Sequence, residues 1–300
     1  MKKLLVLGGS GLIGNALLKN SENKFDILTT FNKNPITIES LRSFHYSLPN
    51  DLNKLEDLLT NEKPDILVNT MGYSNIDFCE SNKNDADILH VEITEKISNI
   101  CENLEIKQIF LSSDYIFGGE KGNYSETDLP NPVNYYGLSK LKAEQIILKN
   151  PINTIIRTSV IYDWDYRARF FNYVVKNLQK KQSITATTDA YHSITFLDNL
   201  VKSILKVIKL NQNGIFHVVD STCVNRFEFA KIIAKIFQLD ESLIKTISVR
   251  DIPSFVAKRP KNICLNNSKA KKELGLGFNT IEEGVRKVFM KSQLWFKNNY

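Results

Sequence analysis

Short apolar runs recur along the chain, separated by longer stretches in which apolar residues return every three or four positions. The short runs are typical of buried strands, and the longer stretches are typical of helices packed on one face. Residues 52–59, 86–103 and 197–210 are predicted helices on this basis. The predicted strands are residues 3–7, 25–30, 65–69, 109–113, 154–157 and 215–219. This alternation predicts an α/β fold with a doubly wound, parallel, Rossmann-like sheet.

The regular alternation weakens from Tyr162 onward, which predicts a second, smaller α/β lobe at the C-terminal end. The predicted division is residues 1–158, rejoined by residues 189–219, for the first domain, and residues 159–188 and 220–300 for the second lobe. Residues 227–237 carry an apolar stripe that is typical of a core helix. Aromatic and basic residues gather at 164–171. They fit either loops that hold a substrate or the aromatic packing of a small lobe.

Composition and charge agree with a folded protein that binds small anions. The chain has 300 residues, of which 42% are apolar, and this is enough for a large core. The net charge of +6 is spread out, with only doublets such as Lys180-Lys181 and Lys271-Lys272. A nucleic-acid interface would concentrate its charge. We therefore expect a solvated basic surface, small anionic ligands and no nucleic-acid partner.

Neither a membrane segment nor a metal site is predicted. Gly8 interrupts the first apolar run too early for a signal peptide, and no run reaches the roughly 20 apolar residues that span a bilayer. The expected location is the cytoplasm. The cysteines, Cys79, Cys101, Cys223 and Cys264, are widely spaced and have no histidine at ligand spacing. We expect all of them to be reduced thiols with structural roles.

A glycine-rich turn follows the first predicted strand directly and precedes a predicted helix. Glycine stands at every third position of residues 8–14. In dinucleotide-binding folds such glycines allow a tight turn, let a pyrophosphate approach the backbone and let the helix pack on the strand. A plain turn without a ligand is the alternative. The predicted cofactor contacts here are Gly8, Ser10, Gly11, Leu12, Ile13 and Gly14.

The ends of the next two strands bear on which cofactor binds. Asn32 and Lys33 follow the second strand, where an NAD site usually has a carboxylate for the ribose 2′-hydroxyl. No acid is present at residues 31–34, and a 2′-phosphate needs a donor or a cation. We therefore predict NADPH, with NADH as the alternative; Lys33 as a solvated loop lysine is the competing interpretation. Residues 69–71, which are Asn69, Thr70 and Met71, are expected to border the cofactor.

Hydroxyl groups and a tyrosine–lysine pair provide the candidate chemistry. The strand at 109–113 ends in Ser113, at the sheet edge where ligands bind in such folds. Tyr136 and Lys140 lie four positions apart on a predicted helix, so their side chains share one face. Lowering a tyrosine pKa from ~10 to ~7 takes roughly 4 kcal/mol, and a nearby ammonium acts in that direction. We expect Lys140 to lower the pKa of Tyr136, which then serves as a general acid.

Together these motifs resemble the dTDP-4-dehydrorhamnose reductase family of the extended short-chain dehydrogenase/reductase superfamily, over nearly the whole chain. The resemblance rests on residues 8–14, 69–80, 112–117, 124–140, 157–159 and 259–260. It implies NADPH-dependent reduction of a nucleotide-activated 4-keto-6-deoxy sugar, in deoxysugar and cell-surface polysaccharide biosynthesis such as that of dTDP-rhamnose. By this resemblance Ser113 hydrogen-bonds the carbonyl oxygen, Tyr136 donates the proton, and Lys140 holds the ribose.

The substrate side follows from the same resemblance but departs from the family pattern. Val160 stands where the rhamnose-forming reductases usually carry a substrate-facing tryptophan, so we expect Trp164 or Tyr162 to supply part of that surface. Residues 189–195 match the family's Asp-Gln-x-Gly-Ser-Pro-Thr stretch only in part, and no carboxylate cluster matches the magnesium site of some members. Arg259 is expected to bind the nucleotide diphosphate. The predicted substrate contacts are Tyr73, Ser113, Asp114, Val160, Trp164 and Arg259.

Two other functions fit the same superfamily. A nucleotide-sugar epimerase would retain NAD through its cycle, although the acid-free strand end fits a dissociating NADPH better. The regulatory subunit of methionine adenosyltransferase also resembles this family and would bind NADP without turnover, but the presence of Ser113, Tyr136 and Lys140 favours an enzyme. The expected partner is a nucleotide-diphosphate sugar, and a homodimer is the assembly considered.

Overall fold

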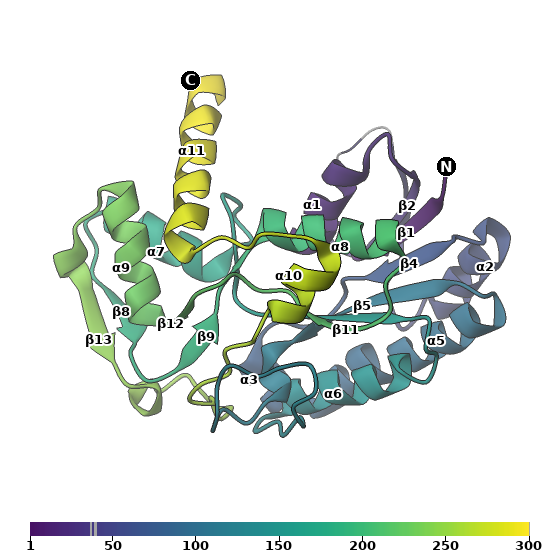
Figure 1. The fold of residues 1–300 in the computed structure, drawn as a ribbon, viewed down its shortest axis with the longest axis horizontal. Coiled ribbons are helices and arrows are strands. Elements are labelled where there is room, and N and C mark those ends of the chain that lie inside the picture. The colour runs from purple at the N-terminus through teal and green to yellow at the C-terminus, as the bar shows by residue number, and fades with distance from the viewer. Residues whose placement is uncertain (37, 39–40, 300) are drawn as a thin grey trace.

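The computed structural model describes residues 1–36, 38 and 41–299 (Figure 1). The strands of its main sheet are β1 (Lys3–Leu7), β2 (Asp26–Phe31), β3 (Arg42–His45), β4 (Ile66–Asn69), β5 (Lys107–Ser113), β6 (Thr154–Thr158) and β11 (Gly214–His217). They form a seven-stranded sheet in the order β11-β6-β5-β4-β1-β2-β3, and every pairing is parallel. The strand order reverses between β1 and β4, where such sheets bind ligands. The predicted doubly wound sheet is confirmed.

Helices cover both faces of this sheet (Figure 1). In β1, Leu4 and Val6 join one core and Leu5 and Leu7 the other, because successive side chains of a strand alternate. The first face is covered by α1 (Leu12–Ser21), α8 (Leu197–Leu210) and α10 (Ser268–Leu274). The opposite face is covered by α2 (Leu52–Glu62), α5 (Ile93–Asn103) and α6 (Tyr135–Ile147). The helices predicted at 52–59 and 197–210 are thus confirmed.

The helix predicted over residues 86–103 is present and contains a π-helical turn. The structure has α3 (Ile76–Ser81), α4 (Lys83–Asp87) and a π-helical turn at Ile88–Glu92 before α5 begins. The turn carries the buried ring of His90, whose Nε2 accepts the Tyr73 N–H at 2.9 Å. That contact comes from another segment, so the local apolar period did not reveal the π-helical turn.

The second lobe has a core of its own. Its helices are α7 (Arg169–Gln179), α9 (Arg226–Phe237) and α11 (Ile281–Asn299), and 3₁₀ turns lie at Glu241–Leu243 and Val249–Asp251. Its strands pair in twos: β7 (Ile161–Tyr162) with β10 (Thr195–Phe196), β8 (Ile184–Thr187) with β13 (Ile244–Ile247), and β9 (Tyr191–Ser193) with β12 (Cys223–Asn225). Phe229, Ile233 and Ala234 of α9 are buried in this core, as the apolar stripe predicted.

Two segments cross the predicted domain boundary. Helix α10 comes from the C-terminal stretch but packs on α8 and β11, so it covers the sheet of the first domain. Strand β9 pairs with β12, which places Tyr191–Ser193 with the second lobe. The parts of residues 189–219 that rejoin the first domain are α8 and β11.

The expectation that every cysteine is reduced is wrong. Cys223 and Cys264 form a disulfide with Cα atoms 5.7 Å apart, whereas Cys79 and Cys101 are free and buried. The bonded pair is 41 residues apart in sequence. The two meet because Tyr191 pairs with both β12 and the segment before Cys264, where its N–H donates to the Lys261 carbonyl at 2.7 Å. Sequence spacing does not reveal this tertiary meeting.

Candidate active site

Strand β5 brings a serine to the carboxyl edge of the sheet. All 7 residues of β5 are buried, and the chain then enters a 3₁₀ turn at Asp114–Ile116 that Ser113 caps. The Ser113 Oγ donates to the Asp114 Oδ1 at 3.0 Å and accepts the Tyr115 N–H at 3.3 Å. Ser113 is therefore fixed at the end of the strand, as predicted from its position after an apolar run.

Helix α6 brings Tyr136 to the same edge. The Asn134 side chain caps the helix by accepting the Gly137 N–H at 2.9 Å. A Cβ on Gly137 would lie 2.0 Å from the Tyr115 carbonyl oxygen, so glycine lets the helix start this close to the end of β5. The Tyr136 ring packs edge-on against Tyr115, with 5.7 Å between centroids, and the Ser113 side chain lies close enough to act on the Tyr136 pKa.

The acidity of Tyr136 differs from the prediction. Burial raises the pKa of Tyr136 to about 12, and the hydrogen bond with Ser113 opposes this shift. The Lys140 Nζ donates instead to the Leu111 carbonyl at 2.7 Å and lies 4.3 Å from the Phe110 ring centroid, while burial lowers the Lys140 pKa to about 8. The expected lowering of the Tyr136 pKa by Lys140 is wrong for this structure, because the ammonium is bonded to the strand backbone and burial disfavours both charged forms.

The glycine turn has the geometry of a phosphate cradle. Gly8 has a φ of +82°, which favours glycine. A Cβ on Gly14 would lie 2.4 Å from the Gly8 carbonyl oxygen, so glycine is needed for α1 to start so close to β1. Leu12 and Ile13 pack their side chains against the core, which leaves their N–H groups at the start of α1. Such unpaired N–H groups favour an anion.

The neighbouring strand ends lie beside this turn. Leu7 is in register with Asn69, and the Thr70 Oγ1 donates to the Leu7 carbonyl at 2.7 Å. The Met71 N–H donates to the Asn69 Oδ1 at 3.0 Å. The structure therefore brings Asn69, Thr70 and Met71 next to Gly8. Asn32 and Lys33 are exposed immediately after β2.

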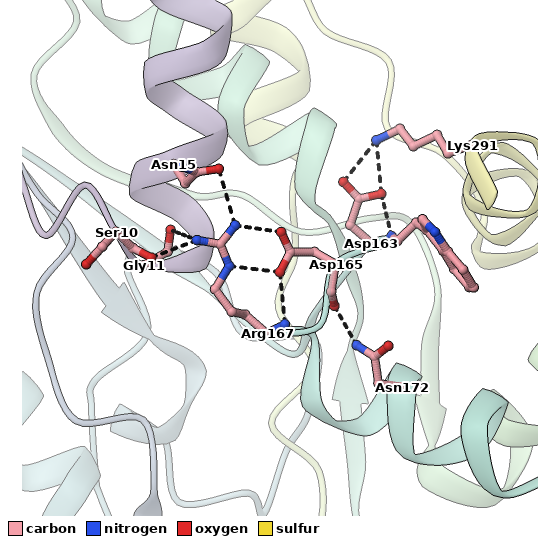
Figure 2. Close-up of polar contacts among 9 residues, drawn as sticks. Ser10, Gly11, Asn15, Asp163, Asp165, Arg167, Asn172 and Lys291 are labelled. Atoms are coloured by element: carbon pink, nitrogen blue, oxygen red, sulfur yellow. Dashed lines mark hydrogen bonds and ion pairs between the residues drawn. The ribbon is translucent and has the colours of Figure 1, made fainter. Parts of the chain in front are cut away.

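An arginine of the second lobe reaches the glycine turn. Figure 2 shows Arg167 at the start of α1, where its Nη1 donates to the carbonyl oxygens of Ser10 at 2.7 Å and Gly11 at 3.2 Å. Its Nη2 donates to Asn15 at 3.2 Å and to Asp165 at 2.6 Å. Sequence reasoning did not assign Arg167 to the cofactor site. The basic and aromatic stretch at 164–171 was the available signal, but it could not show which residue reaches across.

Asp114 connects the end of β5 with the second lobe. This carboxylate is buried, and its Oδ2 accepts the Ser159 hydroxyl at 2.5 Å and lies 3.2 Å from the His192 Nδ1. The His192 ring lies 5.7 Å from that of Tyr115, between centroids. Ser159 and His192 were not predicted as site residues, because their sequence positions give no sign that both meet Asp114.

Tyr162 and Trp164, which were expected to replace the missing tryptophan, differ in how far they are buried. Tyr162 is fully buried and its hydroxyl lies 3.4 Å from Asp220, so the expectation that it faces a sugar is wrong. It belongs to the core of the second lobe, where Phe171 and Phe229 pack around it. The half-buried Trp164 stacks on Phe237 with 6.1 Å between centroids, and the half-buried Val160 packs against the same core.

Arg259 lies near the site but its charge is paired. Its Nη2 bonds to Asp77 at 2.5 Å, its Nη1 donates to the Ala257 carbonyl at 2.8 Å, and the guanidinium stacks on the Phe255 ring. Tyr73, just after the β4 end, is 37% exposed and contacts the His90 ring.

Two other kinds of site are absent from the described part of the chain. No group of three or more His, Cys, Asp or Glu residues among the described positions could hold a metal ion. None of the described helices is both long and apolar enough to cross a membrane.

Known sequences are similar to this chain over most of its length. The family model for the RmlD substrate binding domain matches residues 1–294. The probable low-salt glycan biosynthesis reductase Agl14 of Haloferax volcanii is 27% identical over 287 residues, which cover 93% of this chain and 95% of that protein. The methionine adenosyltransferase 2 subunit beta of Bos taurus is 25% identical over 306 residues, which cover 98% of this chain and 87% of that protein.

Solved structures share the whole architecture. A hypothetical dTDP-4-dehydrorhamnose reductase from Sulfolobus tokodaii has a TM-score of 0.85 and 32% identity, and the match covers 95% of this chain and 99% of that chain. The dTDP-4-dehydrorhamnose reductase of Bacillus anthracis in complex with NADP has a TM-score of 0.83 and 22% identity, covering 97% of this chain and 100% of that chain. At 22% identity the second likeness shows the fold.

Proposed function

Because the chain belongs to the RmlD substrate binding domain family, we propose that it uses NADPH to reduce the C4 keto group of a nucleotide-activated 4-keto-6-deoxy sugar. The chain is an oxidoreductase of the short-chain dehydrogenase/reductase type. The observation that carries the proposal is that Ser113 and Tyr136 meet at the carboxyl edge of the sheet, where the Tyr136 ring packs edge-on against Tyr115 and the Ser113 side chain acts on the Tyr136 pKa. The glycine turn lies at the same edge, after β1.

The residues at the glycine turn fit a dinucleotide. At Gly14 the turn leaves no room for a side chain, so only glycine fits there. The first N–H groups of α1 would bind the pyrophosphate. Asn32 and Lys33 would meet a 2′-phosphate without an opposing carboxylate, which supports NADPH over NADH. The structural relative from Bacillus anthracis contains NADP. When bound, the cofactor supplies the hydride for C4 of the sugar.

The proton and the polarising hydrogen bond come from the chain. With a pKa of about 12, Tyr136 holds its proton at neutral pH and is ready to donate it to the alkoxide that forms at C4. Ser113 would turn its one hydroxyl proton from the Asp114 Oδ1 to the same oxygen and stabilise its developing charge. Lys140 would hold the ribose, after exchanging its contact with the Leu111 carbonyl for ribose hydroxyls.

The substrate contacts predicted from the sequence are kept in the proposal, except for Tyr162. Tyr73, Asp114, Val160 and Trp164 stay in the proposal, with Asp114 acting through its hydrogen bond to Ser113. Arg259 stays as a contact for the nucleotide part of the substrate. Tyr162 leaves the proposal because it is enclosed in the core. A homodimer and a cytoplasmic location also remain proposals; the Cys223–Cys264 disulfide would be unusual in a reducing cytoplasm.

The proposal is tested by a screen of NADPH oxidation. The purified full chain is mixed with NADPH and, in turn, with dTDP-, UDP- and GDP-linked 4-keto-6-deoxy sugars. We expect the nicotinamide absorbance to fall in proportion to the added sugar with at least one of them. NADPH left unconsumed with every sugar, by a protein that binds NADPH, would overturn the proposed reaction.

A second candidate is a regulatory subunit that binds NADP without turnover. The observation that favours it is the 25% identity to the bovine methionine adenosyltransferase subunit over 98% of this chain. The geometry at Ser113 and Tyr136 favours an enzyme, because a subunit that performs no chemistry does not need a buried phenol beside a serine at the sheet edge. Stable co-purification with a synthetase, together with no NADPH oxidation, would decide for the regulatory subunit.

A further inference from the structure

Arg226, the first residue of α9, has a guanidinium group without a polar partner among the described residues. Its Nη1 is buried and donates to no acceptor among the described residues. The group makes a cation–π contact, with the guanidinium carbon 4.5 Å from the centroid of the Phe170 ring, and this contact supplies no hydrogen-bond acceptor. A buried charged donor without an acceptor is costly. Such a group is expected where a ligand provides the missing acceptor.

The surroundings of Arg226 place it on the substrate side of the active site. Strand β12 leads directly into Arg226, and its Val224 is in register with His192. His192 lies 3.2 Å from Asp114 and its ring is tilted against Tyr115, which in turn packs against Tyr136. The charges of Asp114 and Arg259 and the hydroxyl of Tyr115 all act on the Arg226 guanidinium, whose pKa is lowered chiefly by burial.

The two arginines near the site differ in charge balance. Arg259 and Arg226 each stack on an aromatic ring, but Arg259 is neutralised by Asp77. The carboxylate whose charge acts on Arg226, that of Asp114, already contacts Ser113, Ser159 and His192. Arg226 therefore leaves an unbalanced positive charge beside the catalytic residues.

We infer that Arg226 binds the diphosphate of the nucleotide-linked substrate, an inference that rests on the proposed function and names the residue that recognises its anionic part. A guanidinium matches phosphate oxygens with two parallel N–H donors, and Phe170 holds the plane of the group in place. The pyrophosphate of the cofactor has a separate site, because the glycine turn offers the N–H groups of α1 and Arg167 is bonded to that turn. Arg226 thus discriminates nucleoside diphosphate compounds from neutral sugars.

The test is isothermal titration calorimetry of the full chain with UDP and with dTDP. Arg226→Gln should weaken the binding of the diphosphate that the wild type binds by about tenfold or more, because a charge-assisted hydrogen bond is lost. The same variant should leave NADP⁺ affinity unchanged. Arg250→Gln is the matched control, because Arg250 lies in the same lobe and its side chain is 87% exposed; it should change neither affinity.

If Arg226→Gln does not fold, Arg226→Met replaces it in the titrations, because the methionine side chain keeps an apolar stem that can pack on Phe170. The inference is overturned if the wild type binds neither diphosphate, if the folded variant binds as tightly as the wild type, or if NADP⁺ affinity falls by the same factor. These titrations contain no keto sugar and no turnover. They can therefore fail while the proposed reductase activity stands, or succeed where no reductase activity is found.

Discussion

The carboxyl edge of the parallel sheet and the second lobe contribute to one site by different physical means. At the sheet edge Ser113 and the glycine turn are fixed by backbone geometry and by hydrogen bonds to residues close in sequence. The second lobe contributes side chains that reach across, such as Arg167 and His192, and each meets a partner far away in sequence. The first region determines where chemistry takes place, and the second determines which charges surround it.

Three arginines of the second lobe show how its side chains differ in the partners they have. Arg167 is saturated by Asp165, Asn15 and two carbonyl oxygens of the glycine turn. Arg259 is paired with Asp77. Arg226 has no polar partner among the described residues. Arginines from one lobe thus differ: Arg167 bridges to the glycine turn, Arg259 is a paired charge, and Arg226 has a buried N–H group without an acceptor among the described residues.

The largest effect is expected from removing the acid at the sheet edge. Tyr136→Phe deletes one hydroxyl and should lower turnover by about 100-fold or more, the usual scale for a lost general acid. The fold and NADPH affinity should not change, because the phenylalanine ring keeps the contacts with Tyr115. Steady-state kinetics and NADPH titration measure both. Wild-type turnover in a folded Tyr136→Phe protein would remove Tyr136 from the acid role.

The next effect concerns the ion pair that ties α6 to the sheet. Arg157 of β6 bonds to Glu144 of α6 at 2.7 Å, and both side chains are almost completely buried. Glu144→Ala leaves the arginine charge buried and unpaired, so the free energy of unfolding should fall by about 3 kcal/mol or more.

Glu95→Ala is the matched control for this stability prediction. The contact of Glu95 with Lys149 is exposed and 3.7 Å long, so its loss should cost under about 1 kcal/mol. Urea unfolding of both variants measures the difference. Equal losses would mean that the buried pair does not hold α6 in place.

A smaller effect, on NADPH affinity, is expected at Arg167, which connects the second lobe to the glycine turn. Arg167→Met removes the donors that hold the Ser10 and Gly11 carbonyl oxygens, so NADPH should bind about tenfold more weakly. UDP and dTDP affinity should stay the same. Arg169→Met is the control, since Arg169 is exposed two positions further along. Unchanged NADPH affinity in Arg167→Met would show that the glycine turn keeps its geometry without the second lobe.

The smallest predicted effect lies at the exposed end of β2. Asn32→Asp would place a carboxylate near the 2′-phosphate, and repulsion in solvent should weaken NADPH binding by about threefold to fivefold. NADH lacks this phosphate, so its affinity should change less. Fluorescence titration with both cofactors compares the two dissociation constants. An equal change in both would contradict the assignment of Asn32 to the 2′-phosphate.

The same contrast explains how far the sequence allowed prediction. The alternation of strands and helices is a local pattern. The parallel sheet, helix α8 and the place of Ser113 at a strand end could therefore be predicted. The Lys140 bond to the Leu111 carbonyl depends on how α6 lies across β5, and spacing along a helix cannot show it. The roles of Arg226 and the Cys223–Cys264 pair depend on how distant segments pack.

The proposed transfer of hydride to C4 is tested most directly by following the hydrogen itself. The full chain is incubated with NADPH deuterated at the transferable position of the nicotinamide and with the keto sugar that supports turnover, and the product is analysed by NMR. The account predicts one deuterium at C4 of the sugar for each cofactor oxidised, with far less product from Tyr136→Phe. A product that carries no deuterium at C4 while the cofactor is not consumed, as an epimerase would give, would contradict it.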